Sequence, residues 1–172
     1  MMEISARKFK LRSLRRGDEV SITAYANNLK IYKATLALPY PYARRDAREW
    51  IEQNLREQQH KHPGMVSFAI DIDGEAVGCI GFSDVEPHKA EVGYWLAEPF
   101  WGQGIGTQAL RLVTRYGFEQ QMLRRIFAQA FPFNKASIRV LEKAGYKLEG
   151  RLRKNEIKDG RLIDTLLYAK IR

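Results

Sequence analysis

The clearest pattern in the chain is an alternation of apolar and polar residues on both sides of the dipeptide Asp73-Gly74. Apolar side chains occupy every second position over 68–72, which is the period of a β-strand, and a second strand-like run follows the dipeptide. Because Asp-Gly favours a tight type I′ turn, the pattern predicts a β-hairpin. A second Asp-Gly pair at 159–160 lies between two further strand-like runs and predicts another hairpin.

The remaining elements follow from helical spacing and short apolar runs. The sequence predicts helices over 18–27, 46–58, 106–120 and 134–144, and further strands over 8–14, 90–96 and 125–130. Asp18 is expected to cap the first helix with its carboxylate, and Gly145 to end the last one. This order predicts a single α+β domain over 1–172, in which about four helices flank a mixed, mostly antiparallel sheet of about seven strands in layers.

The composition suits a folded protein, since 45% of the 172 residues are hydrophobic. The apolar runs are shorter than the roughly 20 residues of a membrane-spanning helix, and the charged N-terminal segment predicts no secretory signal. A single cysteine, Cys79, and the lack of zinc-like Cys/His spacing predict neither an internal disulfide nor a metal site. We expect a soluble, cytoplasmic monomer or homodimer that does not bind a membrane.

The formal net charge of +9 is the unusual bulk property. It fits a polyanionic partner, but it equally fits a solvated basic surface. The two densest basic segments, 6–16 and 149–161, lack the interleaved aromatic residues of a base-stacking surface. We therefore expect no direct nucleic-acid binding, with an RNA-binding module as an alternative that a steep salt dependence of binding would support.

Three glycines at alternate positions, Gly102, Gly104 and Gly106, interrupt the segment "FWGQGIGTQAL" between a strand and a helix. A glycine-rich turn before a helix N-terminus is a common phosphate site, because the first helical N–H groups have no partner within the helix. The segment lacks the Gly-Lys-Ser/Thr ending of a P-loop, and it is not a good dinucleotide fingerprint. Spacing alone leaves a phosphate site and an ordinary flexible turn as equal alternatives.

Two longer segments carry a family resemblance. The run "AEVGYWLAEPFWGQGIGTQALRLVTRYGF", followed by "NKASIRVLEKAGYKLEG", resembles the acetyl-CoA-binding core of the GNAT (general N-acetyltransferase) superfamily. More narrowly, the chain resembles the ribosomal-protein serine or alanine N-terminal acetyltransferases, the RimJ/RimL-like group. The similarity is strongest over 77–150, and the opening strand and "PYPYARRDAREWI" extend it. The resemblance implies an acyltransferase that moves an acetyl group from acetyl-CoA to a primary amine.

The resemblance also implies which residues bind acetyl-CoA, the co-substrate. Gly104 and Gly106 match the two small positions of the pattern Gln/Arg-x-x-Gly-x-Gly/Ala, so the backbone N–H groups of 103–107 would hold the CoA pyrophosphate. Trp101 stands at the first position, where we expect a packing role, and Gly102 has no role in the pattern. The strand that ends at Leu96 would splay from its neighbour and supply an N–H to the thioester carbonyl. The implied cofactor-binding residues are Trp95, Leu96, Gln103, Gly104, Ile105, Gly106, Thr107, Asn134 and Ser137.

The catalytic residues are a further expectation. Many superfamily members place a tyrosine in the second helix as general acid, but Leu141 fills that position here, and Ser137 is the residue that the RimJ/RimL-like group offers instead. The acceptor amine must lose a proton to a group or a water chain. Glu91 is the first candidate base, since the apolar residues that follow it can raise its pKa. Asp164 on the last strand is the second candidate, and His88 is the third.

The acceptor is the least determined part of the sequence. A protein N-terminus is the first expectation, and a polyamine, an amino sugar or an antibiotic is the alternative. The resemblance assigns Tyr32, Tyr40, Tyr42 and Arg45 to the acceptor groove, and Arg111, Lys135, Arg139 and Lys143 are candidates to meet the CoA phosphates. A domain that binds acyl-CoA without catalysis is a further alternative, because the usual tyrosine is replaced.

Overall fold

The computed structural model describes residues 3–61 and 63–172. Its strands are β1 (Glu3–Ser5), β2 (Lys10–Ser13), β3 (Val66–Ile72), β4 (Glu75–Ser83), β5 (Lys89–Leu96), β6 (Arg125–Ala130), β7 (Lys147–Lys158) and β8 (Arg161–Ile171). Its helices are α1 (Glu19–Ala26), α2 (Leu29–Ala34), α3 (Arg44–Glu57), α4 (Ile105–Glu119) and α5 (Lys135–Lys143), with a 3₁₀ turn, η1, at Glu98–Phe100.

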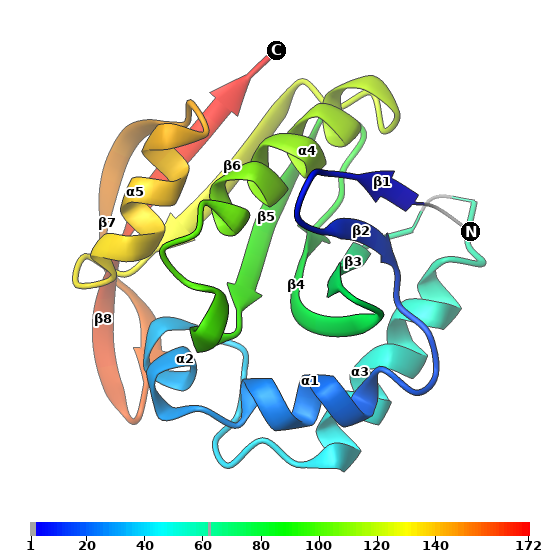
Figure 1. The fold of residues 1–172 in the computed structure, drawn as a ribbon. Helices are drawn as coiled ribbons and strands as arrows, with labels where there is room; N and C mark the ends of the chain where they lie inside the picture. Colours follow the sequence, from blue (N-terminus) through cyan, green and yellow to red (C-terminus); the bar gives the residue numbers. More distant parts are fainter. Residues whose placement is uncertain (1–2, 62) are drawn as a thin grey trace.

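The strands form one sheet in the order β1-β2-β3-β4-β5-β6-β8-β7 (Figure 1). Within the part of the chain that is described, each neighbouring pair is antiparallel except β5 and β6, which are parallel. A parallel pair needs a crossover connection, and α4 supplies it between these two strands. The predicted fold class is therefore confirmed, with a mixed and mostly antiparallel sheet.

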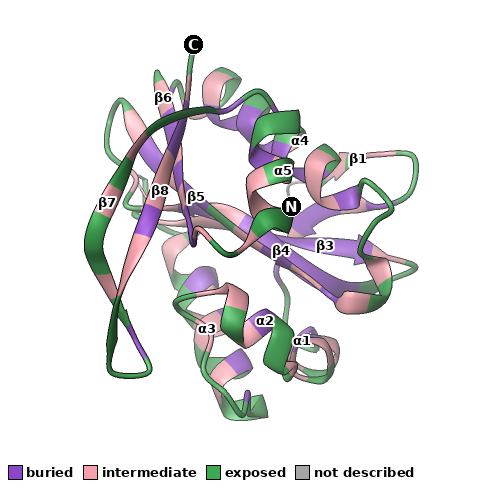
Figure 2. Cartoon of the chain, turned by 90° about the vertical axis from the view of Figure 1, so that its left-hand side faces the viewer, coloured by how far each residue is buried: buried purple, intermediate pink, exposed green. Residues whose placement is uncertain are grey.

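Helices cover both faces of the sheet and enclose two hydrophobic clusters. Figure 2 shows α4 and α5 on one side of the sheet and α1, α2 and α3 on the other. Leu110 of α4 and Leu141 of α5 are fully buried in the first cluster, whereas Ile51 of α3 is buried in the second. Because side chains alternate along a strand, Val92 of β5 packs in the first cluster and Trp95 in the second.

The two parallel strands separate from each other halfway along their length. They pair only from Lys89 to Glu91 on β5 and from Arg125 to Phe127 on β6. Beyond these residues, β5 continues to Leu96 without pairing with β6, and the two arrows diverge in Figure 1. The splay that the resemblance implied is thus present, and it leaves the β6-facing backbone edge of β5 available to a ligand.

Both predicted hairpin turns are confirmed by their backbone angles. Asp73 and Gly74 have φ of +53° and +91°, and Asp159 and Gly160 have φ of +51° and +72°. A type I′ turn requires positive φ at both central residues, which Asp and Gly tolerate better than most residues. The Asp-Gly pairs therefore determine where each hairpin turns.

Two short elements were not predicted from the sequence. The strand β1 has three residues and α2 has six, so neither is long enough to show a period of hydrophobicity. The helix α2 depends instead on its N-cap, since the side chain of Asn28 accepts hydrogen bonds from the N–H groups of Lys30 and Ile31. Within the described residues, the sheet has eight strands rather than about seven, and five helices flank it rather than about four.

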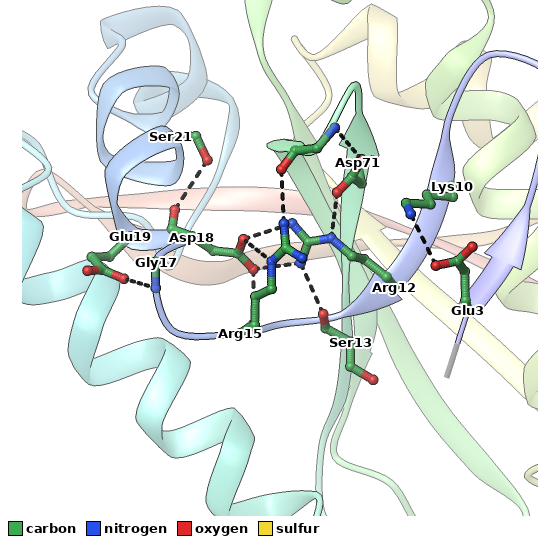
Figure 3. A network of polar contacts seen from close by, with 11 residues as sticks. Glu3, Lys10, Arg12, Ser13, Arg15, Gly17, Asp18, Glu19, Ser21 and Asp71 are labelled. Carbon is green, nitrogen blue, oxygen red and sulfur yellow. Dashed lines mark hydrogen bonds and ion pairs between the residues drawn. The ribbon is translucent and has the colours of Figure 1, made fainter. Parts of the chain in front are cut away.

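Asp18 stands at the N-cap position of α1, but the prediction that its carboxylate caps the helix is wrong. The carboxylate instead accepts hydrogen bonds from Arg12 at 2.7 and 2.8 Å, and Arg12 Nε donates to Asp71 at 2.5 Å (Figure 3). All three side chains are buried. The two carboxylates raise the pKa of the Arg12 guanidinium despite its burial. This buried ion network joins α1 to β2 and β3.

Candidate active site

Left-handed glycines shape the turn that precedes α4. Gly102 has a φ of +74° and Gly104 a φ of +80°, a backbone conformation that strains any residue with a Cβ. Gly106 differs, because a Cβ built on it would lie 3.8 Å from Val140 Cγ2, which is an ordinary contact. The backbone path therefore accounts for glycine at 102 and 104, and the fold itself leaves room for alanine at 106.

The N-terminus of α4 offers hydrogen-bond donors to an anion. The first helical hydrogen bond runs from the N–H of Gln108 to the carbonyl of Gly104 at 3.0 Å. The N–H groups of 105–107 precede it and so have no carbonyl partner within the helix. Gly104, the N-cap residue, carries no side chain with which to cap them. Together with the positive end of the helix dipole, these donors suit a phosphate group.

Two side-chain hydrogen bonds connect this turn to the end of β5 and to η1. The indole Nε1 of Trp101 donates to the carbonyl of Leu96 at 2.7 Å, and Gln103 Nε2 donates to the carbonyl of Pro99 at 3.1 Å. Trp101 does not pack in the core, because the residue is 43% exposed, and a packing role at an interface stays a prediction. Its indole N–H fixes the distance between the glycine turn and the splayed strand.

The free edge of β5 presents backbone groups toward the splay. The N–H of Ala97 donates to Val77 on β4 at 2.8 Å, and hydrogen-bonding direction alternates along an antiparallel strand. The N–H groups of Leu96 and Tyr94 therefore point the opposite way, toward β6. A donor on this edge agrees with the expected role of the Leu96 region in polarising a thioester carbonyl.

Asn134 and Ser137 occupy the first turn of α5. The side-chain oxygen of Asn134 caps the helix by accepting from the N–H of Ser137 at 3.1 Å. Its Nδ2 donates to the carbonyl of Ala34 at 3.2 Å, which connects α5 to the end of α2 on the other side of the sheet. The capping function expected of Asn134 is present, and it orients the helix turn that carries Ser137.

The structure adds Tyr94 to the residues expected from the sequence. Its hydroxyl lies 2.9 Å from Ser137 Oγ, although the two residues are 43 positions apart. Burial raises the pKa of Tyr94 to about 12, and the hydrogen bond with Ser137 partly opposes this. The alternation along β5 was the available signal, since it places Tyr94 on the same face as Val92 and Leu96, toward α4 and α5.

The opposite face of β5 carries Glu91, at the last residue that pairs with β6. Burial is the main cause that raises the pKa of this carboxyl group, and the nearby Asp84 and Glu156 add to the effect. Hydrogen bonds from the side chain and backbone of Gln129 act in the opposite direction. A half-buried carboxylate with a raised pKa suits a proton acceptor.

A polar cluster contributed by three other strands surrounds Glu91. Gln129 Oε1 on β6 accepts from Asn155 Nδ2 at 2.7 Å and from Thr165 Oγ1 at 2.8 Å. Asn155 also donates to Glu156 at 3.1 Å. Because the amide oxygen of Gln129 accepts two hydrogen bonds, its nitrogen is the group that faces Glu91. This cluster could not be predicted from the sequence, since it depends on β8 lying between β6 and β7.

Asp164 and His88, the other two candidate bases, lie apart from Glu91. Asp164 accepts from Arg151 Nε at 2.7 Å and from the N–H of Lys154 at 2.8 Å, and both contacts lower the pKa of its carboxyl group. It also faces the other side of the sheet, because its neighbour Thr165 points toward the Glu91 cluster. His88 precedes β5, and the six residues from it to Tyr94 span about 20 Å of strand. Neither position favours a base.

Two of the residues expected in the acceptor groove, Tyr32 and Tyr40, belong to a wall of contacts that joins α2 to the β7–β8 turn. The hydroxyl of Tyr32 bonds the carboxylate of Asp159, and Lys158 Nζ donates to the carbonyl of Thr35 at 2.7 Å. The Lys158 ammonium also lies 3.8 Å from the centre of the Tyr32 ring, and the ring of Tyr40 packs beside it. These contacts connect the two segments directly, on the side of the sheet opposite α5.

The other residues expected to meet substrates divide into buried and exposed ones. Tyr42 is buried in the cluster with α1 and α3, so it packs rather than lines a groove. Arg45 is exposed on α3. Arg111 donates to the carbonyl of Lys143 at 2.5 Å and ties α4 to the end of α5, whereas Lys135 and Arg139 are exposed on α5.

The described residues show neither a metal centre nor a membrane span. No three His, Cys, Asp or Glu side chains in 3–61 and 63–172 gather in a way that suits a metal ion. Among the described helices, none combines the length and apolarity needed to cross a bilayer.

Comparison with known proteins agrees with this geometry. The family model described as "Acetyltransferase (GNAT) domain" matches residues 8–147. The chain is 34% identical to the ribosomal-protein-serine acetyltransferase of Escherichia coli over 128 residues, covering 73% of this chain and 70% of that protein. It is 25% identical to the spermidine N(1)-acetyltransferase of E. coli over 150 residues, covering 86% and 77%. The solved structure of RimL, a ribosomal L7/L12 α-N-protein acetyltransferase in complex with coenzyme A, superposes with a TM-score of 0.88 at 26% identity and covers 99% and 98% of the two chains.

Proposed function

Because this chain belongs to the GNAT acetyltransferase family and is an N-acetyltransferase that uses acetyl-CoA, we propose that its acceptor is the α-amine of a protein N-terminus. The relatives named for ribosomal-protein acetylation support this choice over other amines. The observation that carries the proposal is the wall that joins α2 to the β7–β8 turn on the acceptor side. A polypeptide that passes through the site would have to part these contacts, whereas a chain end enters without parting them.

The residues of the glycine turn fit the phosphate part of acetyl-CoA. The N–H groups of 105–107 would hold the pyrophosphate, and the left-handed Gly104 places them at the helix start. Gly104 leaves open space beside these donors, since nothing lies within 4 Å of a Cβ built on it. The backbone edge of β5 at Tyr94 and Leu96 would pair with the pantetheine arm, since these groups face away from β4.

Glu91 is the proposed proton acceptor for the amine. An α-amine has an ordinary pKa near 7.7–8.0, so a modest fraction is neutral at physiological pH and a weak base suffices. Glu91 lies three residues from Tyr94, about 10 Å along the strand, so a chain of water molecules must carry the proton from the amine to Glu91. Burial, together with the nearby carboxylates of Asp84 and Glu156, raises the pKa of Glu91 and brings its basicity closer to that of the amine.

Ser137 is the proposed hydrogen-bond donor to the departing sulfur. It projects from the first turn of α5, where the Asn134 cap holds the backbone. The alignment of two bound substrates supplies much of the acceleration in such a direct attack, so one weak donor and one weak base are enough.

A small amine is the second candidate acceptor. The chain is similar over most of its length to a spermidine acetyltransferase, and a closed acceptor wall also suits a small molecule. The two candidates differ in size and in what surrounds the amine.

An acceptor panel separates them. The purified protein is incubated with acetyl-CoA and either short peptides with different N-terminal residues or a series of polyamines and amino sugars, and free thiol is measured. We expect thiol release with peptides that begin with serine or alanine. Release with polyamines but with none of the peptides would contradict the proposal. The same peptides with an acetylated N-terminus serve as controls and should release no thiol.

A further inference from the structure

We propose that Tyr94 is a positioning residue for acetyl transfer, and that its hydroxyl orients Ser137 so that the Ser137 O–H points at the departing sulfur. The inference rests on the proposed function, because it requires that Ser137 act on the thioester. It assigns a role to a half-buried hydroxyl on β5 that neither substrate needs to touch.

The contact between the two hydroxyls is specific in geometry. The Tyr94 hydroxyl lies 2.9 Å from Ser137 Oγ and 3.3 Å from the Ser137 carbonyl oxygen. A tyrosine has one proton, so it donates to only one of these acceptors at a time. When it donates to Oγ, the serine proton is free for another acceptor, and rotation about the Cα–Cβ bond is restrained.

The two partners are held by different parts of the fold. Ser137 is fixed from behind by the bond from its N–H to Asn134 at 3.1 Å, within the first turn of α5. The ring of Tyr94 packs against the core that α4 and α5 cover, on the strand that splays from β6. The hydroxyl pair therefore bridges the strand that carries the N–H donors and the helix that carries the serine.

The raised pKa of Tyr94 determines whether its hydroxyl can give up its proton. Its pKa of about 12 lies more than three units above the value of about 8.5 for an ordinary thiol, so transfer of its proton to a thiolate is unfavourable. Tyr94 therefore keeps its proton and donates only a hydrogen bond.

The bonds and protons of the proposed transfer balance. The C–S bond breaks with its electron pair on sulfur, while the amine nitrogen forms the new bond to the acetyl carbon. The proton lost by the amine goes through water to Glu91. Ser137 hydrogen-bonds the thiolate as it forms, and the thiolate takes its proton from solvent after it leaves.

The test is a double-mutant cycle with Tyr94→Phe and Ser137→Ala, measured as the single-turnover rate with the best peptide of the acceptor panel. Loss of one hydrogen bond corresponds to about a 3- to 10-fold change in rate. We expect Tyr94→Phe to lower the rate by this factor with an unchanged KM for acetyl-CoA, and Ser137→Ala to lower it at least as much. The double variant should be no slower than Ser137→Ala alone, because Tyr94 acts only through Ser137.

Tyr146→Phe is the matched control. This tyrosine is buried, and its hydroxyl bonds Thr114 Oγ1 at 2.7 Å instead of Ser137. We expect it to leave the rate unchanged, with melting temperatures that show all variants folded.

The outcomes separate this inference from the function on which it rests. A normal rate for Tyr94→Phe beside a slow Ser137→Ala overturns the role of Tyr94 alone. Multiplied effects in the double variant, or equal slowing by Tyr146→Phe, overturn it as well. A normal rate for Ser137→Ala removes Ser137 from the mechanism and Tyr94 with it, and no turnover of the unchanged protein with any peptide overturns the proposed function.

Discussion

The glycine turn allows a prediction in which two neighbouring substitutions have opposite effects on stability. Gly104→Ala places a Cβ on a residue with φ of +80°, although nothing lies within 4 Å of that Cβ. The free energy of unfolding should therefore fall only by the cost of holding alanine in the left-handed backbone conformation, about 1–2 kcal/mol. Gly106→Ala puts alanine in an ordinary helical position with a single contact at 3.8 Å, and it should gain about 0.5–1 kcal/mol.

The assay is urea unfolding of both variants, followed by far-ultraviolet circular dichroism. With a slope of about 1–3 kcal/mol per molar urea, the two midpoints should differ by roughly 0.5–3 M, with Gly104→Ala the lower. Gly102→Ala is the matched control for the backbone term, because Gly102 has a φ of +74° and equally open surroundings. Equal midpoints for Gly104→Ala and Gly106→Ala would refute the claim that only the first glycine is required by the backbone.

Two further predictions concern Glu91 and the buried ion network. Glu91→Gln should slow acetyl transfer yet raise the melting temperature at pH 7. The folded protein holds the Glu91 proton more tightly than the unfolded chain, so the stability of the unchanged protein falls as pH rises from about 4.5 through the raised pKa. The gain in melting temperature of Glu91→Gln should therefore vanish near pH 4. An equal gain at both pH values would contradict this. Arg12→Met should destabilise the protein by about 3–5 kcal/mol in chemical unfolding, because it leaves the buried Asp71 without its ion-pair partner and Asp18 with only Arg15. Arg16→Met, which removes an exposed ion pair, should change stability by less than about 1 kcal/mol, and similar losses for the two arginines would disprove the role of burial.

The sequence predicted those parts of the fold that depend on local chemistry. The Asp-Gly pairs located both hairpin turns, and the segment 125–130 was assigned to a strand with the bounds that the structure has. Elements without a local period were missed, as β1 and α2 show. The role of Asp18 could not be predicted, because Arg12 competes for its carboxylate only once β2 and α1 are packed together.

The candidate site divides in the same way. The glycine turn, the Asn134 cap and the splay of β5 could be expected from motifs that are continuous in sequence. The need for glycine at 102 became clear only from its positive φ. The hydrogen bond between Ser137 and Tyr94 could not be predicted either, because it forms only when α5 packs on β5. Asp164 is a carboxylate on the last strand and so a candidate base from the sequence. Its neighbour Thr165 points toward the Glu91 cluster, so Asp164 lies on the opposite face of the sheet.

A competition between two peptides tests whether the acceptor is an N-terminal α-amine. Two peptides of the same sequence compete for acetyl-CoA in one reaction, one with a free α-amine and an acetylated lysine, the other with an acetylated α-amine and a free lysine. We expect the peptide with the free α-amine to be consumed at least about 100-fold faster, since a lysine with a pKa near 10.4 is almost fully protonated at neutral pH and the wall between α2 and the β7–β8 turn admits a chain end. Equal consumption of the two peptides, or preference for the lysine, would contradict the account.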